Sequence, residues 1–280
     1  MPTLPNKPRK LTISNFDQEL DPNAKDCDLT PLTFIDAYGL VETACALRLA
    51  LGEETGLLIK APSNEATRSH LSAMGLRDFL EGFGLASLLP ESPTFDASDV
   101  VVPLRSGTQS GGEQAASHLL WEQLQGDVSP QVLEALAEGI WEMVGNAQEH
   151  SGSDPLIMAQ VYNAKRGKKS FDHNNRVQVV VGDSGRGIRQ SFLATGAHQP
   201  ASDLEAIELA LQYLVTSVID DPGRGQGLST TMEQVIGLQG RMVVRSGSGK
   251  VSIDADRTEK AKVPMLAGTV VALSLPLYPG

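Results

Sequence analysis

The stretch that decides the fold is LAEGIWEMVGNAQEHS, residues 136–151. Its apolar residues recur at helical spacing, and Glu142, Asn146 and His150 follow one another at four-residue steps. Because residues four apart lie on the same side of a helix, these three polar side chains form one stripe. Such a stripe is typical either of a solvated helix face or of a helix that faces a ligand, and the segments that follow decide between the two.

The next informative stretch is VQVVVGDSGRGI, residues 177–188, which is apolar up to Asp183 and then turns polar. Gly185 and Gly187 remove side chains, so that backbone can approach a ligand. An aspartate at the end of a buried strand needs a hydrogen-bond donor. Asp183 is either a turn residue that accepts from its own backbone or an acceptor for the exocyclic amine of adenine. Guanine has a carbonyl there and would leave the carboxylate unpaired.

Two further glycine segments follow in the chain. GRGQGL at 223–228 places glycines, among them Gly225 and Gly227, directly before a predicted helix. Free N–H groups and the helix dipole bind phosphate oxygens at such a position, although a simple helix entry or a hinge has the same pattern. AGTVVALSLP at 267–276 then places Thr269 at the start of the last strand.

Taken in order, these segments are E-x-x-x-N on a helix, D-x-G-x-G after a strand, G-x-G-x-G-L before a helix and G-T opening a strand. The series resembles the N, G1, G2 and G3 boxes of the GHKL ATPase superfamily, which includes histidine kinases, type II topoisomerases, mismatch-repair ATPases and anti-sigma serine kinases. The resemblance covers residues 113–278. It implies the Bergerat fold, an α/β two-layer sandwich with helices on one face of a mixed, mostly antiparallel sheet.

The resemblance also implies ATP and Mg²⁺ as cofactors and gives each matching residue a role. Asn146 supplies the side-chain oxygen for Mg²⁺, and Glu142 orients or deprotonates the attacking water. Asp183 recognises adenine, and Thr269 supplies a hydroxyl on the adenine side. Close backbone and phosphate contacts are assigned to Gly185, Gly187, Ile188, Arg224, Gly225, Gly227 and Leu228.

One position departs from the family pattern. Many histidine kinases carry a basic residue three positions after the asparagine, where this chain has Glu149. The phosphate charge must therefore be met elsewhere, by Arg186, Arg224 or the metal ion. Arg224 is preferred because it lies within the glycine turn.

The first domain has the order of a βαβα unit. It consists of the strand LTFID at 32–36, a helix, the strand GLLIKAP at 56–62, which we expect to be buried on both faces, and a second helix with Ser63 as N-cap and Gly75 as C-cap. LTFIDAYGL, GLLIKAP and SAMGLRDFL resemble the STAS-like domains that precede GHKL ATPase domains in some bacterial regulatory proteins. Ser63 and Thr67 lie where STAS antagonists carry a phospho-acceptor, but a helix cap is the preferred role of Ser63.

The predicted organisation is an N-terminal arm over 1–30, a STAS-like domain over 31–105, a linker at 106–112 and an ATP-binding domain over 113–280. In the last domain the patterns predict helices at 113–125, 129–149, 203–217 and 226–238, strands at 155–164 and 176–183, hairpin-like strands GRMVVRS and GKVSID, and a final strand AGTVVALSLPL.

Composition excludes several classes of partner. The formal charge of −11 and pI near 4.9 repel phosphate backbones, so we expect no nucleic acid partner. The sequence lacks an apolar run of the ~18 residues that would span a bilayer, and its start lacks the apolar centre of a signal peptide. We therefore expect a cytoplasmic protein without a membrane partner. Cys27 and Cys45 have no metal-type spacing and are expected to be buried thiols.

These patterns predict an ATP- and Mg²⁺-binding regulatory protein that hydrolyses ATP slowly or transfers phosphate to a protein partner. A non-catalytic nucleotide-sensing module and an anti-sigma-type serine/threonine protein kinase are the alternatives. Catalytic and degenerate GHKL pockets keep the same glycines, so the sequence leaves these alternatives open. A homodimer is compatible with each of them.

Overall fold

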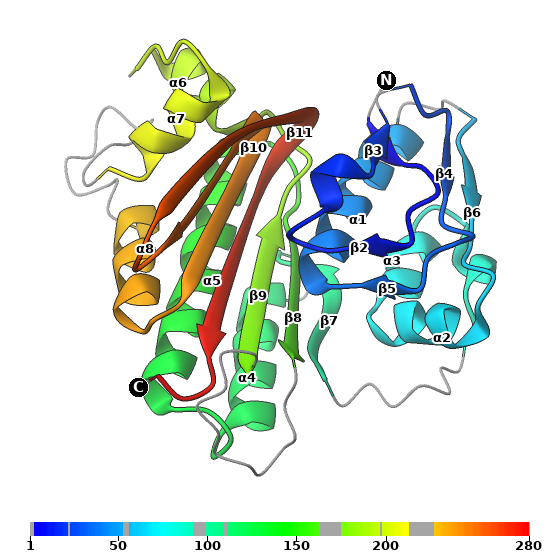
Figure 1. The fold of residues 1–280 in the computed structure, drawn as a ribbon, viewed down its shortest axis with the longest axis horizontal. Helices are drawn as coiled ribbons and strands as arrows, with labels where there is room; N and C mark the ends of the chain where they lie inside the picture. Colours follow the sequence, from blue (N-terminus) through cyan, green and yellow to red (C-terminus); the bar gives the residue numbers. More distant parts are fainter. Residues whose placement is uncertain are drawn as a thin grey trace.

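A five-stranded antiparallel sheet forms the centre of the molecule, and helices pack on it to give a mixed α/β fold (Figure 1). This computed structural model describes residues 3–21, 23–52, 56–91, 99–108, 111–162, 175–196, 198–212 and 227–279. The strand order is β10-β11-β9-β8-β7, and each neighbouring pair is antiparallel. The strands are β7 (Val100–Ser106), β8 (Leu156–Tyr162), β9 (Arg176–Gly182), β10 (Arg241–Asp254) and β11 (Thr258–Pro276).

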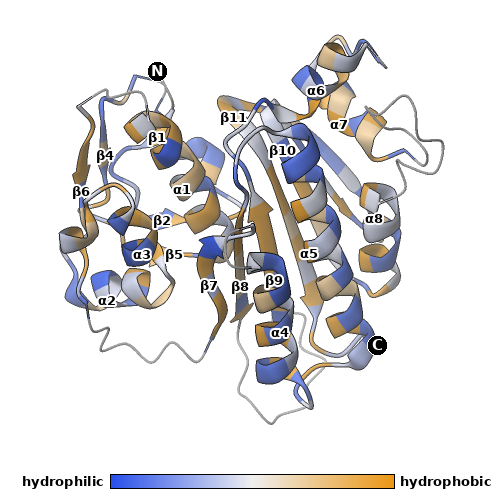
Figure 2. Ribbon diagram, turned by 180° about the vertical axis from the view of Figure 1, so that it is seen from behind, coloured by the Kyte–Doolittle hydropathy of each residue, from blue (hydrophilic) through white to orange (hydrophobic). Residues whose placement is uncertain are grey.

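One face of the sheet is covered by α4 (Gly112–Leu124), α5 (Pro130–His150) and α8 (Gly227–Gly237). Figure 2 shows α4 and α5 in front of strands that are coloured mainly as hydrophobic. These helices begin and end within two residues of the predicted boundaries. Within the described ranges, none of the helices combines the length and apolar character needed to cross a membrane.

Helix α5 is built as its sequence predicts. Ser129 is its N-cap and accepts a hydrogen bond from the backbone nitrogen of Val132, and Pro130 occupies the first helical position. Its apolar side, which includes Ile140 and Val144, is buried in one core with β8, β9 and β11. The polar stripe of the same helix lies outside this core.

The opposite face of the sheet is covered by α1 (Ala37–Gly52), which packs against β8, β9 and β11. The expected arrangement, with helices on one face alone, is therefore incomplete. Val179 and Val181 of β9 are buried toward α5, while Val180 is buried toward α1. A strand that is apolar on both sides is typical of a sheet covered on both faces.

Residues 3–21 and 23–30 form part of the packed first half of the chain (the described residues between 3 and 91) and do not form the loosely attached arm that was expected. Leu4, Leu11 and Phe16 are all buried. β1 (Leu4–Pro5) pairs with β3 (Leu20–Asp21). β2 (Lys10–Leu11) pairs with β5 (Phe34–Ile35), and β4 (Asp26–Asp28) pairs with β6 (Leu58–Lys60). β5 and β6 lie within the predicted strands LTFID and GLLIKAP. The strands β1 to β4 were not predicted, because strands of two or three residues are too short to show a period.

Two further expectations for this half were wrong. β6 is not buried on both faces, because Leu58 is 51% exposed and only Ile59 points into the core. The N-cap of α2 (Glu65–Ala73) is Asn64, whose side chain accepts from the backbone nitrogen of Thr67, and not Ser63. Gly75 does follow this helix with a positive φ of 89°, before α3 (Leu76–Glu81), and Cys27 and Cys45 are buried free thiols as predicted.

The edges of the central sheet also differ from the predictions. β7, grouped by sequence with the first domain and the linker, pairs with β8 in the central sheet. GRMVVRS and GKVSID are one strand, β10, which passes through register shifts around Gly247 and pairs along its length with β11. A glycine-containing bulge at that point imitates a turn in the sequence.

Helices α6 (Gly187–Thr195) and α7 (Asp203–Ala210) lie at one end of the sheet (Figure 1). α6 is not among the helices predicted from the sequence. The helix predicted at 203–217 corresponds to α7, which begins at the expected residue and has Ser202 as its N-cap. Residues 213–226, which include Arg224 and Gly225, lie outside the described residues.

Candidate functional site

A cavity of about 510 Å³ lies between α5, α6, the start of α8, the C-terminal end of β9 and the middle of β11. This volume lies within the range of small-molecule sites, roughly 300–1,000 Å³. The predicted site residues that line it are Glu142, Asn146, Asp183, Gly187, Ile188, Gly227, Leu228 and Thr269. Segments that are far apart in sequence therefore meet at one cavity.

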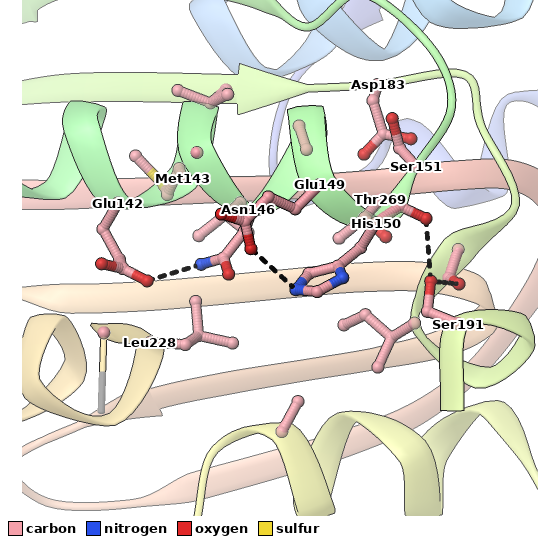
Figure 3. Close-up of a pocket in the computed structure, with 18 of the residues that line it drawn as sticks. Glu142, Met143, Asn146, Glu149, His150, Ser151, Asp183, Ser191, Leu228 and Thr269 are labelled. Carbon is pink, nitrogen blue, oxygen red and sulfur yellow. Dashed lines mark hydrogen bonds and ion pairs between the residues drawn. The ribbon is translucent and has the colours of Figure 1, made fainter. Parts of the chain in front are cut away.

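The polar stripe of α5 runs along one wall of the cavity (Figure 3). Glu142, Asn146 and His150 project from the same side of the helix, as their spacing predicts. The amide nitrogen of Asn146 donates to Glu142 Oε1 at 2.8 Å. This hydrogen bond uses the amide nitrogen, so the amide oxygen of Asn146 is the atom left to accept from a donor or bind a cation.

The carboxylate of Glu142 lies against the first residue of α8. A side-chain carbon at Gly227 would overlap with that carboxylate. A helix N-terminus carries free N–H groups and a partial positive charge, which favour an anion. Gly227 therefore makes room for negative charge at this end of the cavity.

Asp183 lies at the other end of the cavity, directly after β9, and is only 4% exposed. Its Oδ1 accepts from the backbone nitrogen of Gly185 at 2.8 Å, which is the turn bond that the sequence offered as one alternative. Burial raises the pKa of Asp183 to about 6, and hydrogen bonds from the backbone of Gly185 and Thr269 and the charge of Arg48 oppose that rise. Asp183 thus has two roles: its carboxylate forms the turn bond after β9, and it is also part of the buried lining of the cavity.

The glycines around Asp183 have different roles. Gly268 has a φ of 94°, and a side-chain carbon there would overlap with the carbonyl oxygen of Asp183. Gly187 starts α6 with a φ of 76° and lines the cavity. Gly185, predicted to contact the ligand, packs instead against the carbonyl oxygen of Ser151 and is not among the described lining residues.

The sequence analysis missed Ser246, which ties the surrounding segments together. Its hydroxyl accepts from the backbone nitrogen of Ile188 at 2.9 Å and lies 3.1 Å from the hydroxyl of Thr269. Ser246 therefore connects the start of α6 to β10 and β11. A serine within an apolar strand has no distinctive pattern, so only the structure identifies it.

The structure does not bring the second candidate arginine to the cavity. Arg186 is exposed, and its guanidinium lies near Gly152. Glu149 does line the cavity, 3.8 Å from the ring nitrogen Nε2 of its neighbour His150. The described wall is therefore rich in carboxylates, and Arg224, the preferred candidate for phosphate charge, lies outside the described residues.

In the described part of the chain, no three His, Cys, Asp or Glu side chains are grouped so as to hold a metal ion. Comparison of the sequence with protein-family models and with curated proteins gave no match.

Proposed function

We propose that this chain binds ATP with Mg²⁺ in the cavity, in the manner of GHKL ATPases, and hydrolyses it slowly or transfers its phosphate to a protein partner. One observation carries the proposal: Asp183 and the Glu142–Asn146 pair line opposite ends of the same cavity. A nucleotide has a base at one end and phosphates at the other. The Asp183 end of the cavity suits the base, and the end with Glu142 and Asn146 suits the phosphates and their Mg²⁺.

Asp183 suits the base. Its buried carboxylate is mainly ionised at neutral pH, because its pKa of about 6 is below 7. A buried carboxylate favours a ligand that donates a hydrogen bond to it, as the exocyclic amine of adenine does. Guanine presents a carbonyl oxygen at the same position, which would face the carboxylate without a proton between them. We therefore expect a strong preference for ATP over GTP.

Asn146, Glu142 and the start of α8 suit the phosphates. The amide oxygen of Asn146 is a hard oxygen ligand of the kind that Mg²⁺ prefers, and Mg²⁺ commonly takes only one or two protein ligands beside phosphate oxygens and waters. Bound Mg²⁺ would offset phosphate charge next to Glu142 and Glu149. Glu142 is then placed to accept a proton from water, as a general base does.

Binding is tested by isothermal titration calorimetry with ATP, ADP and GTP, each with and without Mg²⁺. Asp183→Asn should weaken ATP binding and reduce the preference over GTP. Glu134→Gln, on the exposed side of α5, is the matched control and should bind as the wild type does. Equal heats for ATP and GTP in the wild type would refute the role of Asp183.

Catalysis is tested separately with Glu142→Gln. We expect this variant to bind Mg·ATP and to lose release of inorganic phosphate, whereas Glu134→Gln keeps both. Labelled ATP distinguishes the two reactions, because a kinase leaves label on protein and an ATPase releases it. Binding without either product in the wild type would support the nucleotide-sensing alternative.

A further inference from the structure

Helix α1 crosses the far face of the sheet directly behind Asp183. Gly182 points toward α1, and a side-chain carbon there would lie 2.7 Å from Val41 Cγ1 and 3.3 Å from Cys45 Sγ. Because side chains alternate along a strand, Asp183 points the opposite way and lines the cavity (Figure 3). The first half of the chain therefore supports the back of the wall that carries Asp183.

Arg48 projects from α1 one turn after Cys45. Its guanidinium donates through Nη1 to the carbonyl oxygen of Asp154 and lies 5.8 Å from the ring centroid of Phe79 in α3. Phe79 belongs to the first half, and Asp154 belongs to the turn of residues 151–155 that joins α5 to β8. Arg48 therefore connects the two halves of the chain.

The turn that Arg48 contacts also supports the loop of Asp183. Ser153 Oγ accepts from the backbone nitrogen of Ser184 at 3.4 Å, and the carbonyl oxygen of Ser151 accepts from the backbone nitrogen of Arg186 at 3.0 Å. In both bonds the donor is a backbone nitrogen of the loop that carries Asp183, so the turn fixes the backbone of that loop. A displaced turn would therefore displace the loop that carries Asp183.

Arg48 also supplies charge. Burial raises the pKa of Asp183, and the guanidinium of Arg48 opposes that rise from behind the strand. Among the described residues, the ionisable groups around Asp183 include Cys45 on α1, whose thiol pKa is raised by burial, and Glu149 and His150 across the cavity on α5. Glu149 is acidic, so it does not stabilise the ionised form of Asp183.

We infer that Arg48 is a positioning residue for Asp183: it holds the loop of that aspartate and places a positive charge behind its carboxylate. The inference rests on the proposed role of Asp183 in binding adenine. It makes the first half of the chain a structural part of the ligand site, although its helix α1 lies on the far side of the sheet.

Three substitutions separate the two contributions. Arg48→Met removes both donor and charge, Arg48→Gln keeps a donor without the charge, and Arg48→Lys keeps the charge. Arg68→Met is the matched control, since Arg68 also lies in the first half and donates to a backbone carbonyl, that of Pro62. The pKa of the Asp183 carboxyl is measured by NMR in the ligand-free full-length protein. The affinity for Mg·ATP is measured by calorimetry between pH 5.5 and 8.

We expect Arg48→Met to raise the pKa of Asp183, to shift the acid limb of ATP affinity to higher pH, and to weaken ATP binding at pH 7 by roughly tenfold, the scale of one hydrogen bond to a charged group. Arg48→Gln should raise the pKa with a smaller loss of affinity. Arg48→Lys and Arg68→Met should keep the wild-type pKa.

A lower melting temperature without any change in the pKa or the acid limb would overturn the inference and leave Arg48 a merely structural residue. If Arg48→Met does not fold, a wild-type pKa in Arg48→Gln overturns it equally. A shifted pKa in a protein that binds no ATP would support the positioning role while removing the proposed function. The two ideas therefore fail separately.

Discussion

Replacing Asp183 by asparagine should change how stability depends on pH, because the native state binds the proton of this carboxyl more tightly than the unfolded chain does. A pKa of about 6 in the folded protein against an ordinary 3.8 corresponds to about 3 kcal/mol, at roughly 1.4 kcal/mol per pKa unit. The side chain is 4% exposed, so solvent screens little of this energy.

The sign follows from proton linkage. Between about pH 4 and pH 6 the folded state holds a proton that the unfolded state has lost, so falling pH stabilises the wild type. This contribution is fully present below about pH 4 and is lost as the pH rises through 6. Asparagine does not titrate, so the free energy of unfolding of wild type minus that of Asp183→Asn should rise by about 2 kcal/mol from pH 7.5 to pH 4, where the unfolded chain is itself partly protonated.

The assay is urea unfolding followed by the fluorescence of Trp121 and Trp141, at several values of pH between 4 and 8. Other groups titrate in the same range, among them Asp36, whose pKa burial raises to about 6. They are present in both proteins and cancel in the difference. Asp256→Asn, in the exposed turn between β10 and β11, is the control. A difference that stays constant with pH would refute the assignment of a buried, proton-binding carboxyl to residue 183.

The remaining predictions concern the same cavity. Affinity for Mg·ATP should fall below about pH 6 in the wild type as Asp183 is protonated, while Asp183→Asn should lack this acid limb; calorimetry checks both. Gly227→Ala should displace the Glu142 carboxylate at a cost of about 1 kcal/mol, because only the end of that flexible side chain must move, and Glu142→Ala in the same chain should remove this cost, so additive effects in urea unfolding would contradict the contact. Ser246→Ala should cost about 1 kcal/mol for the lost hydrogen bond from Ile188, measured as a lower melting temperature, and an unchanged value would show that this bond contributes nothing.

The local parts of the site could be predicted from sequence. Ser129 and Pro130 mark the start of α5, and the spacing of Glu142 and Asn146 places them on one side of it, because capping and helical periodicity depend only on neighbouring residues. The turn after β9 is equally local, since Asp183 bonds to the backbone two residues later. These features are correct because no distant segment is needed to form them.

The packing of α1 on the far face of the sheet could not be predicted from the sequence in the same way. Every residue of α1 from Ala37 to Leu47 is buried, including small residues on all sides. A helix that is apolar all round is buried on all sides, but its sequence does not say against which element. The contact of Arg48 with Asp154 is likewise tertiary, and it joins residues 106 positions apart.

Arg245 shows why the boundary at residue 30 failed. An arginine within MVVRSGSG suggests a strand with a solvated face, yet Arg245 is buried, 2.9 Å from Asp17 and 3.6 Å from Glu42. Asp17 is 228 positions away and lies in the predicted arm. Removing one partner of a buried ion pair costs ~3–5 kcal/mol, because the other charge stays buried without compensation. Arg245 therefore requires the segment around Asp17 to pack against β10, and no pattern near either residue indicates that requirement. A buried charge on a strand needs a partner of opposite charge, and only the fold identifies that partner.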